Sequence, residues 1–85
     1  MSSLIFEGIR FSAYPNDHAP PHVHGKCGSG VVVVELFEDW TVALSTRRRA
    51  IIPSSMKKSD IKKVLQVAGR RAEQLWRLWE KRDGK

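Results

Sequence analysis

The side chains best suited to chemistry gather in one short segment, YPNDHAPPHVHGKCG, at residues 14–28. It holds all three histidines of the chain, three of its four prolines and its only cysteine. Histidine titrates near neutral pH and is also a common metal ligand. The segment could therefore carry acid–base groups, a metal site, or imidazoles that only pack and hydrogen-bond, and the residue types alone leave all three open.

Proline and spacing limit how these imidazoles can be arranged. The prolines cannot donate backbone hydrogen bonds and favour an extended chain before them, so the segment is not helical. If HVH continues into the strand that follows, His22 and His24 point to the same face, and His18 with Asp17 could fold back toward them. We therefore expect the three histidines to gather at one end of a sheet as accessible, metal-free imidazoles.

Acid–base catalysis is the first chemistry that such a cluster could perform. Two imidazoles beside an arginine could move protons and stabilise the charge that develops while RNA is cleaved. His18, His22 and His24 are thus the candidate catalytic residues, and no cofactor is expected. The alternative is a metal-binding domain, which would require two or three ring nitrogens to converge on one ion.

Length and composition indicate one small globular domain over residues 1–85. The chain is 41% hydrophobic and 28% charged, which is typical of a folded protein with a thin core. No apolar run approaches the roughly 20 residues that cross a bilayer, and the start lacks a secretion signal. A single cysteine excludes an internal disulfide. We expect a cytoplasmic protein that does not engage a membrane.

Charge is distributed unevenly along the chain. Residues 1–40 carry two basic and five acidic side chains and residues 41–85 carry thirteen and four, so the halves net −3 and +9 within a total of +6. Clustered cations attract polyanions and acidic proteins. We expect RNA or an acidic cognate partner protein to bind a surface built from six residues: Arg47, Arg48, Arg49, Lys63, Arg70 and Arg77.

Hydrophobic periodicity predicts an α+β fold. Residues 4–14 alternate as one strand with Ile9, Phe11 and Ala13 on its buried side, GVVVVELF suits a central strand, and WTVALS a third strand joined to it by a hairpin. From about residue 59 the period becomes helical for about 20 residues. We expect a small antiparallel sheet of three or four strands with one long C-terminal helix packed on one face through an apolar stripe: Ile61, Leu65, Ala68, Ala72, Leu75 and Trp79. Gly69 lies within this helix, where a kink or a close backbone contact is possible, and a break into two helices is the main alternative.

The string YPNDHAPPHVH, between a first strand and a valine-rich strand, resembles the hallmark N-D-H-x-P-P-H-x-H of domain-of-unknown-function family 4160. The similarity extends to a C-terminal helix ending in L-x-x-x-W-E, here LWRLWE. The family motif falls on seven residues: Asn16, Asp17, His18, Pro20, Pro21, His22 and His24.

The resemblance implies a small bacterial or archaeal cytoplasmic α+β domain. Such domains are often encoded beside a protein of domain-of-unknown-function family 2442, in pairs that look like toxin–antitoxin modules. Three hypotheses follow: a toxin-like protein that binds RNA through its basic face, a non-enzymatic module masked by an acidic partner, and a metal-dependent domain.

Overall fold

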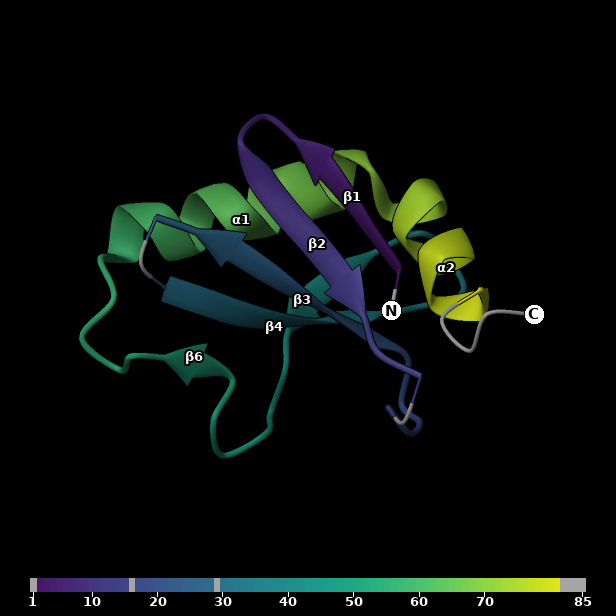
Figure 1. Ribbon diagram of the computed structural model, residues 1–85, viewed down its shortest axis with the longest axis horizontal. Helices are drawn as coiled ribbons and strands as arrows, with labels where there is room; N and C mark the ends of the chain where they lie inside the picture. Colours follow the sequence, from purple (N-terminus) through teal and green to yellow (C-terminus); the bar gives the residue numbers. More distant parts are fainter. Residues whose placement is uncertain (1, 16, 29, 82–85) are drawn as a thin grey trace.

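The computed structural model describes residues 2–15, 17–28 and 30–81 (Figure 1). Within these ranges the chain forms six strands and two helices: β1 (Ser2–Phe6), β2 (Ile9–Ala13), β3 (His22–Cys27), β4 (Gly30–Leu36), β5 (Val42–Leu44), β6 (Ile51–Ile52), α1 (Lys58–Arg70) and α2 (Ala72–Glu80). Neither of these helices combines the length and the apolar character that crossing a lipid bilayer requires.

The strands form one antiparallel sheet in the order β1-β2-β3-β4-β5, and β6 also pairs with β4. Strand β5 pairs with the end of β4 at Val34–Leu36, and β6 with its beginning at Val31–Val32. Both short strands share one edge of β4 because β3 occupies the other edge. The α+β class is confirmed, but the prediction of three or four strands is wrong.

The N-terminal segment is a hairpin, not the single strand predicted over residues 4–14. Glu7 and Gly8 both have positive φ, 53° and 81°, and Phe6 pairs with Ile9 across this two-residue turn. Positive φ at both central positions defines the type I′ turn, whose twist matches that of the flanking strands. The alternation predicted from Ile9 to Ala13 is confirmed: Ile9, Phe11 and Ala13 are buried.

The histidine segment enters a strand of its own. β3 begins at His22 and runs antiparallel to β4 along its whole length, with His24 opposite Val33. HVH therefore does not continue into the valine-rich strand, because the chain reverses between Cys27 and Gly30. The central position of β4 and the hairpin from β4 to β5 are as predicted.

The C-terminal region contains two helices in place of the one long helix predicted. The helical ladder breaks at Arg71, where φ is −116° and ψ is 23°. The guanidinium of Arg71 lies 4.9 Å from the ring centre of Phe6, a cation–π contact. α1 contacts β3, β4 and β5, and beyond the break α2 contacts β1, β2, β3 and β4, so the two helices together cover one face of the sheet.

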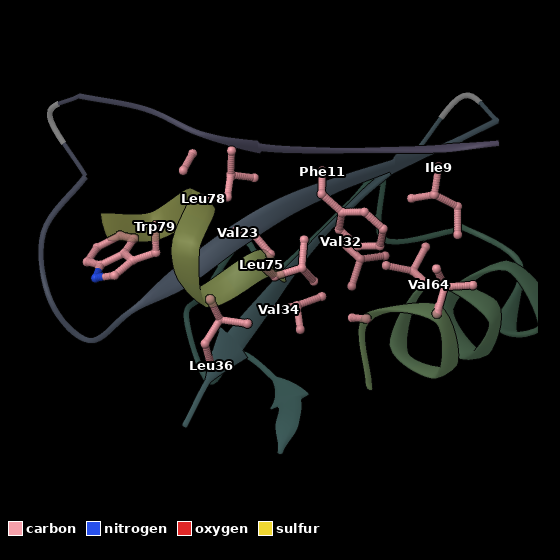
Figure 2. Close-up of a cluster of buried hydrophobic side chains, with 13 residues drawn as sticks. Ile9, Phe11, Val23, Val32, Val34, Leu36, Val64, Leu75, Leu78 and Trp79 are labelled. Carbon is pink, nitrogen blue, oxygen red and sulfur yellow. The ribbon is translucent and has the colours of Figure 1, made fainter. Parts of the chain in front are cut away.

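The core lies between the helices and one face of the sheet (Figure 2). Ala68, Ala72, Leu75 and Trp79 are buried as predicted. Ile61 and Leu65 are only partly buried, and their places in the core are taken by three residues that the predicted stripe omitted: Val64, Val67 and Leu78. The buried face of α1 is thus rotated from the predicted stripe, which assumed one unbroken helix.

Close approach between α1 and the sheet depends on Gly25 in β3. A Cβ atom at this position would lie 2.7 Å from Cγ1 of Val64 and 3.0 Å from Cε1 of Phe11. Such distances are well inside van der Waals contact. Val23 and Gly25 thereby face the helices, and the alternation of the strand sends His24 and Lys26 to the opposite face. No helix of the described residues covers that open face (Figure 1).

Candidate functional site

Asp17, His22 and His24 come together where the proline-rich loop enters β3. Oδ2 of Asp17 lies 3.5 Å from Nε2 of His22 and 3.3 Å from Nε2 of His24. The loop folds back because Asp17 N donates to Tyr14 O at 3.0 Å and Tyr14 N donates to Asp17 Oδ2 at 3.1 Å. This reciprocal turn, a common use of aspartate, presents the carboxylate to both imidazoles.

His22 is almost fully buried, with 1% of its surface exposed. Its Nδ1 lies 2.8 Å from Pro20 O, and because a carbonyl oxygen can only accept a hydrogen bond, Nδ1 carries a ring proton and donates it. Nη2 of Arg47 lies 3.4 Å from the same Nδ1. The other nitrogen, Nε2, has no hydrogen-bond partner among the described residues. Its 3.5 Å separation from Asp17 is close enough for electrostatic attraction but does not meet hydrogen-bond geometry.

His24 is more accessible, with 22% of its side chain exposed. Its ring meets that of Tyr14 edge-on at 4.8 Å and that of His22 at 5.4 Å. Burial lowers the pKa of His24 below its usual value, and the nearby charge and hydrogen bond of Asp17 act in the opposite direction without overcoming it. His24 is therefore mainly neutral at pH 7, with one nitrogen available as an acceptor or a ligand.

His18 does not join this cluster. Its side chain is exposed in the loop, and the group of ligand-type side chains within the described residues consists of Asp17, His22 and His24. The expected gathering of three histidines is thus corrected: Asp17 takes the third place, because the turn at Tyr14 points its carboxylate inward while the next residue points outward. The motif residue Asn16 lies outside the described residues.

The prolines of the motif act through their carbonyl groups. Pro20 O accepts the hydrogen bond from His22, and Pro21 O accepts one from the backbone N–H of Leu36 at 2.9 Å. The second bond ties the loop to the end of β4. Pro20 and Pro21 therefore orient one imidazole and anchor the segment, while the missing N–H groups leave no buried donor unsatisfied.

The six basic residues predicted to bind a partner lie in two regions. Arg47, Arg48 and Arg49 are in the exposed loop between β5 and β6, and Arg47 reaches His22. The other three lie on the helices: Lys63, Arg70 and Arg77. Arg70 forms an ion pair with Glu7 at 2.7 Å, which holds the pKa of Glu7 below its usual value, and Arg77 pairs with Glu73 at 2.9 Å. Half of the predicted set is therefore on the side of the sheet away from His24.

Two cations on the open face were not among the predicted site residues. Arg10 and Lys26 are direct cross-strand partners of β2 and β3, both are exposed, and neither forms an ion pair with another described residue. They line a hollow whose lining also includes Ser12, Tyr14 and His24. The alternation of residues 9–13 already placed Arg10 opposite the core. The register that brings Lys26 beside it was not visible in the sequence.

The chain belongs to the family described as Domain of unknown function (DUF4160), whose family model matches residues 8–80. The match spans the histidine motif, the open face of β2 and β3, and both helices. The resemblance noted in the sequence is confirmed. Searches of the curated proteins and of the solved structures found no match.

Proposed function

We propose that this protein binds RNA through the open face of its sheet, as the toxin-like component of a two-gene toxin–antitoxin-type module. The observation that carries the proposal is the pair Arg10 and Lys26. Like charges directly opposite each other in an antiparallel pair are destabilising. A cation pair that forms no ion pair with another described residue is well placed to bind phosphate groups, whose charge would offset this repulsion.

The neighbours of this pair suit a single strand of RNA. Proteins that bind single strands combine a basic groove with aromatic side chains on which bases stack. Tyr14 is exposed at the end of β2 and lines the same hollow as Arg10 and Lys26. Arg47 lies beside His22. The loop that carries Arg47, Arg48 and Arg49 could therefore contact the phosphates of the RNA beyond the hollow.

The cluster of Asp17, His22 and His24 lies at the edge of the hollow that would hold the RNA. His24 belongs both to the cluster and to the lining of the hollow. A phosphodiester held by Arg10 and Lys26 would therefore lie next to His24 and Asp17, which can exchange a proton with a ribose hydroxyl. We propose His24 as the group that contacts the RNA, and His22, which is buried, as the residue that positions it.

Salt-dependent binding of a labelled single-stranded RNA tests the proposal. Affinity should fall steeply with salt, and Lys26→Glu should weaken binding and make the logarithmic salt slope shallower by about 0.7 for each phosphate that the variant no longer neutralises. Lys62→Glu on α1 is the matched control, because it makes the same charge change at an exposed position on the helical side. Equal effects of the two variants would contradict a site on the open face.

An acidic cognate partner protein is the second candidate, and a different surface favours it. An apolar hollow on α1 lies between lysines and is lined by Lys58, Ile61, Lys62, Leu65 and Gln66. Such a surface suits an acidic amphipathic segment, whose apolar side chains would contact Ile61 and Leu65. Here the two variants exchange roles: Lys62→Glu should weaken binding of the partner, while Lys26→Glu should not.

A further inference from the structure

We propose that Asp17, His22 and His24 form a binding site for a divalent transition-metal ion, with Zn²⁺ as the ion that best fits this ligand set. Two imidazole nitrogens and one carboxylate oxygen are a donor set that zinc and related ions accept, and three protein ligands leave a further position open. The inference does not depend on RNA binding, since it concerns only the geometry of the cluster.

The separations of the donor atoms match a tetrahedral ion. Ligand atoms about 2.0–2.1 Å from zinc lie about 3.3 Å from each other in a tetrahedral arrangement. Oδ2 of Asp17 is 3.5 Å from Nε2 of His22 and 3.3 Å from Nε2 of His24, and the three donor atoms all lie within 4.8 Å of one another. Only the two imidazoles would have to approach each other for all three atoms to reach one ion.

The unpartnered nitrogen of His22 points to the same conclusion. Buried polar atoms almost always have a partner, and the Nε2 atom of this buried ring has none among the described residues. In the neutral ring with its proton on Nδ1, Nε2 presents a lone pair toward the Asp17 carboxylate. Two acceptors facing each other repel unless a cation lies between them. Metal-binding histidines typically donate their other ring N–H to a backbone carbonyl, as His22 does to Pro20.

The surroundings hold the ligands in place and leave a way in. The ring of His22 packs against Trp79 at 5.2 Å, and that of His24 against Tyr14 at 4.8 Å. Asp17 keeps 14% of its side chain exposed and His24 22%, so an ion can enter from the open face. The one nearby cation that contacts the described cluster, Arg47, lies on the Nδ1 side of His22, away from Nε2.

Metal binding would change the hydrogen bonding of His24. In the structure its Nε2 is 3.3 Å from Asp17 and donates to this carboxylate. A metal at Nε2 needs the lone pair there, so the proton of His24 would move to Nδ1, and the carboxylate would contact the ion in place of the N–H. Each ligand would then use an atom that already faces the centre of the cluster.

Isothermal titration of the full chain with zinc chloride tests this site. The protein should carry no polyhistidine tag and should first be stripped with a chelator. We expect one ion per chain, and Asp17→Asn and His24→Ala should each weaken zinc binding at least about tenfold. His18→Ala and Cys27→Ser are the matched controls, because these potential ligands lie outside the cluster, and both should bind zinc within about twofold of the wild type.

Several outcomes would overturn the inference. They are a wild-type chain that binds no zinc, cluster variants that bind it as well as the wild type, or control variants that no longer bind it. The partly exposed positions Asp17 and His24 decide the test, since replacing buried His22 also removes packing. Circular dichroism shows whether each variant is folded, and so whether weaker zinc binding results from unfolding or from the loss of a ligand. The visible absorption of the cobalt-substituted protein provides a second readout, and its disappearance in the folded His24→Ala variant is expected.

Discussion

At the scale of single residues, His22 and His24 belong to one motif but have different environments and different expected roles. His22 is enclosed by Trp79, His24 and the Pro20 carbonyl, whereas His24 opens onto the hollow of the sheet. A buried imidazole that holds a backbone carbonyl stabilises the loop and orients its neighbours. A partly exposed imidazole such as that of His24 can contact a ligand. Stability and function should therefore separate when the histidines are replaced one at a time.

Replacing His22 by alanine should lower the free energy of unfolding by about 3 kcal/mol, because it leaves a cavity beside Trp79 and removes the hydrogen bond to Pro20. His18→Ala removes an exposed ring and should stay within about 0.5 kcal/mol of the wild type. Urea denaturation with a chelator present measures both without any contribution from metal. Similar destabilisation of the two variants would contradict a structural role for His22.

At the scale of strands, the pairing of β2 with β3 places two cations opposite each other at the cost of stability. Lys26→Glu turns the repulsive pair with Arg10 into an attractive one, so the variant should be more stable by about 0.5 kcal/mol. Thermal unfolding at low salt measures the change. Arg49→Glu, an exposed change away from a strand partner, is the control. Greater stability combined with weaker RNA binding is the expected signature; a destabilised variant would contradict this account of the pair.

At the scale of packing between elements, two glycines should respond in opposite directions to the same substitution. Gly25→Ala places a methyl group 2.7 Å from Cγ1 of Val64 and should cost about 2 kcal/mol of stability through overpacking.

Gly69→Ala is the counterpart, in α1, where the nearest atom, Cγ2 of Val42, is 3.8 Å from the new methyl group. It should add about 0.5–1 kcal/mol, because alanine loses less backbone entropy in a helix. Denaturant unfolding of both variants provides the comparison. A Gly25→Ala variant that is as stable as the wild type, or more stable, would show that contact with Val64 does not set the distance between α1 and the sheet.

At the scale of the whole molecule, the two sides of the sheet carry separate binding surfaces. Arg10, Lys26 and His24 line a hollow on the open face, and an apolar hollow lies between lysines on α1. If the protein is the toxin-like member of a pair, its expression without the partner should slow bacterial growth. His24→Ala and Lys26→Glu should relieve the effect at equal protein levels, while His18→Ala should not. Growth curves together with immunoblots measure this. Normal growth with abundant, folded wild-type protein would leave the interaction module as the better hypothesis.

The sequence alone determined what depends on local periodicity and on residue chemistry. The alternation from Ile9 to Ala13, the central valine strand and the helical C-terminal region are all present. A half-buried strand and an amphipathic helix each require a characteristic spacing of apolar residues, which can be read from the local sequence. The specificity of the histidine–proline motif likewise sufficed to identify the family.

Only the tertiary structure decided which distant residues meet. The apolar pattern of the sequence runs on across α1 and α2 and does not show the break at Arg71, beyond which α2 contacts β1 and β2. The register of β2 against β3 brought Lys26 beside Arg10, and the turn at Tyr14 placed Asp17, in preference to His18, against the imidazoles. Contacts of this kind depend on strand register and loop geometry. A register shift of one residue would move every side chain of the strand to the other face, and the local hydrophobic pattern does not reveal how one strand pairs with another.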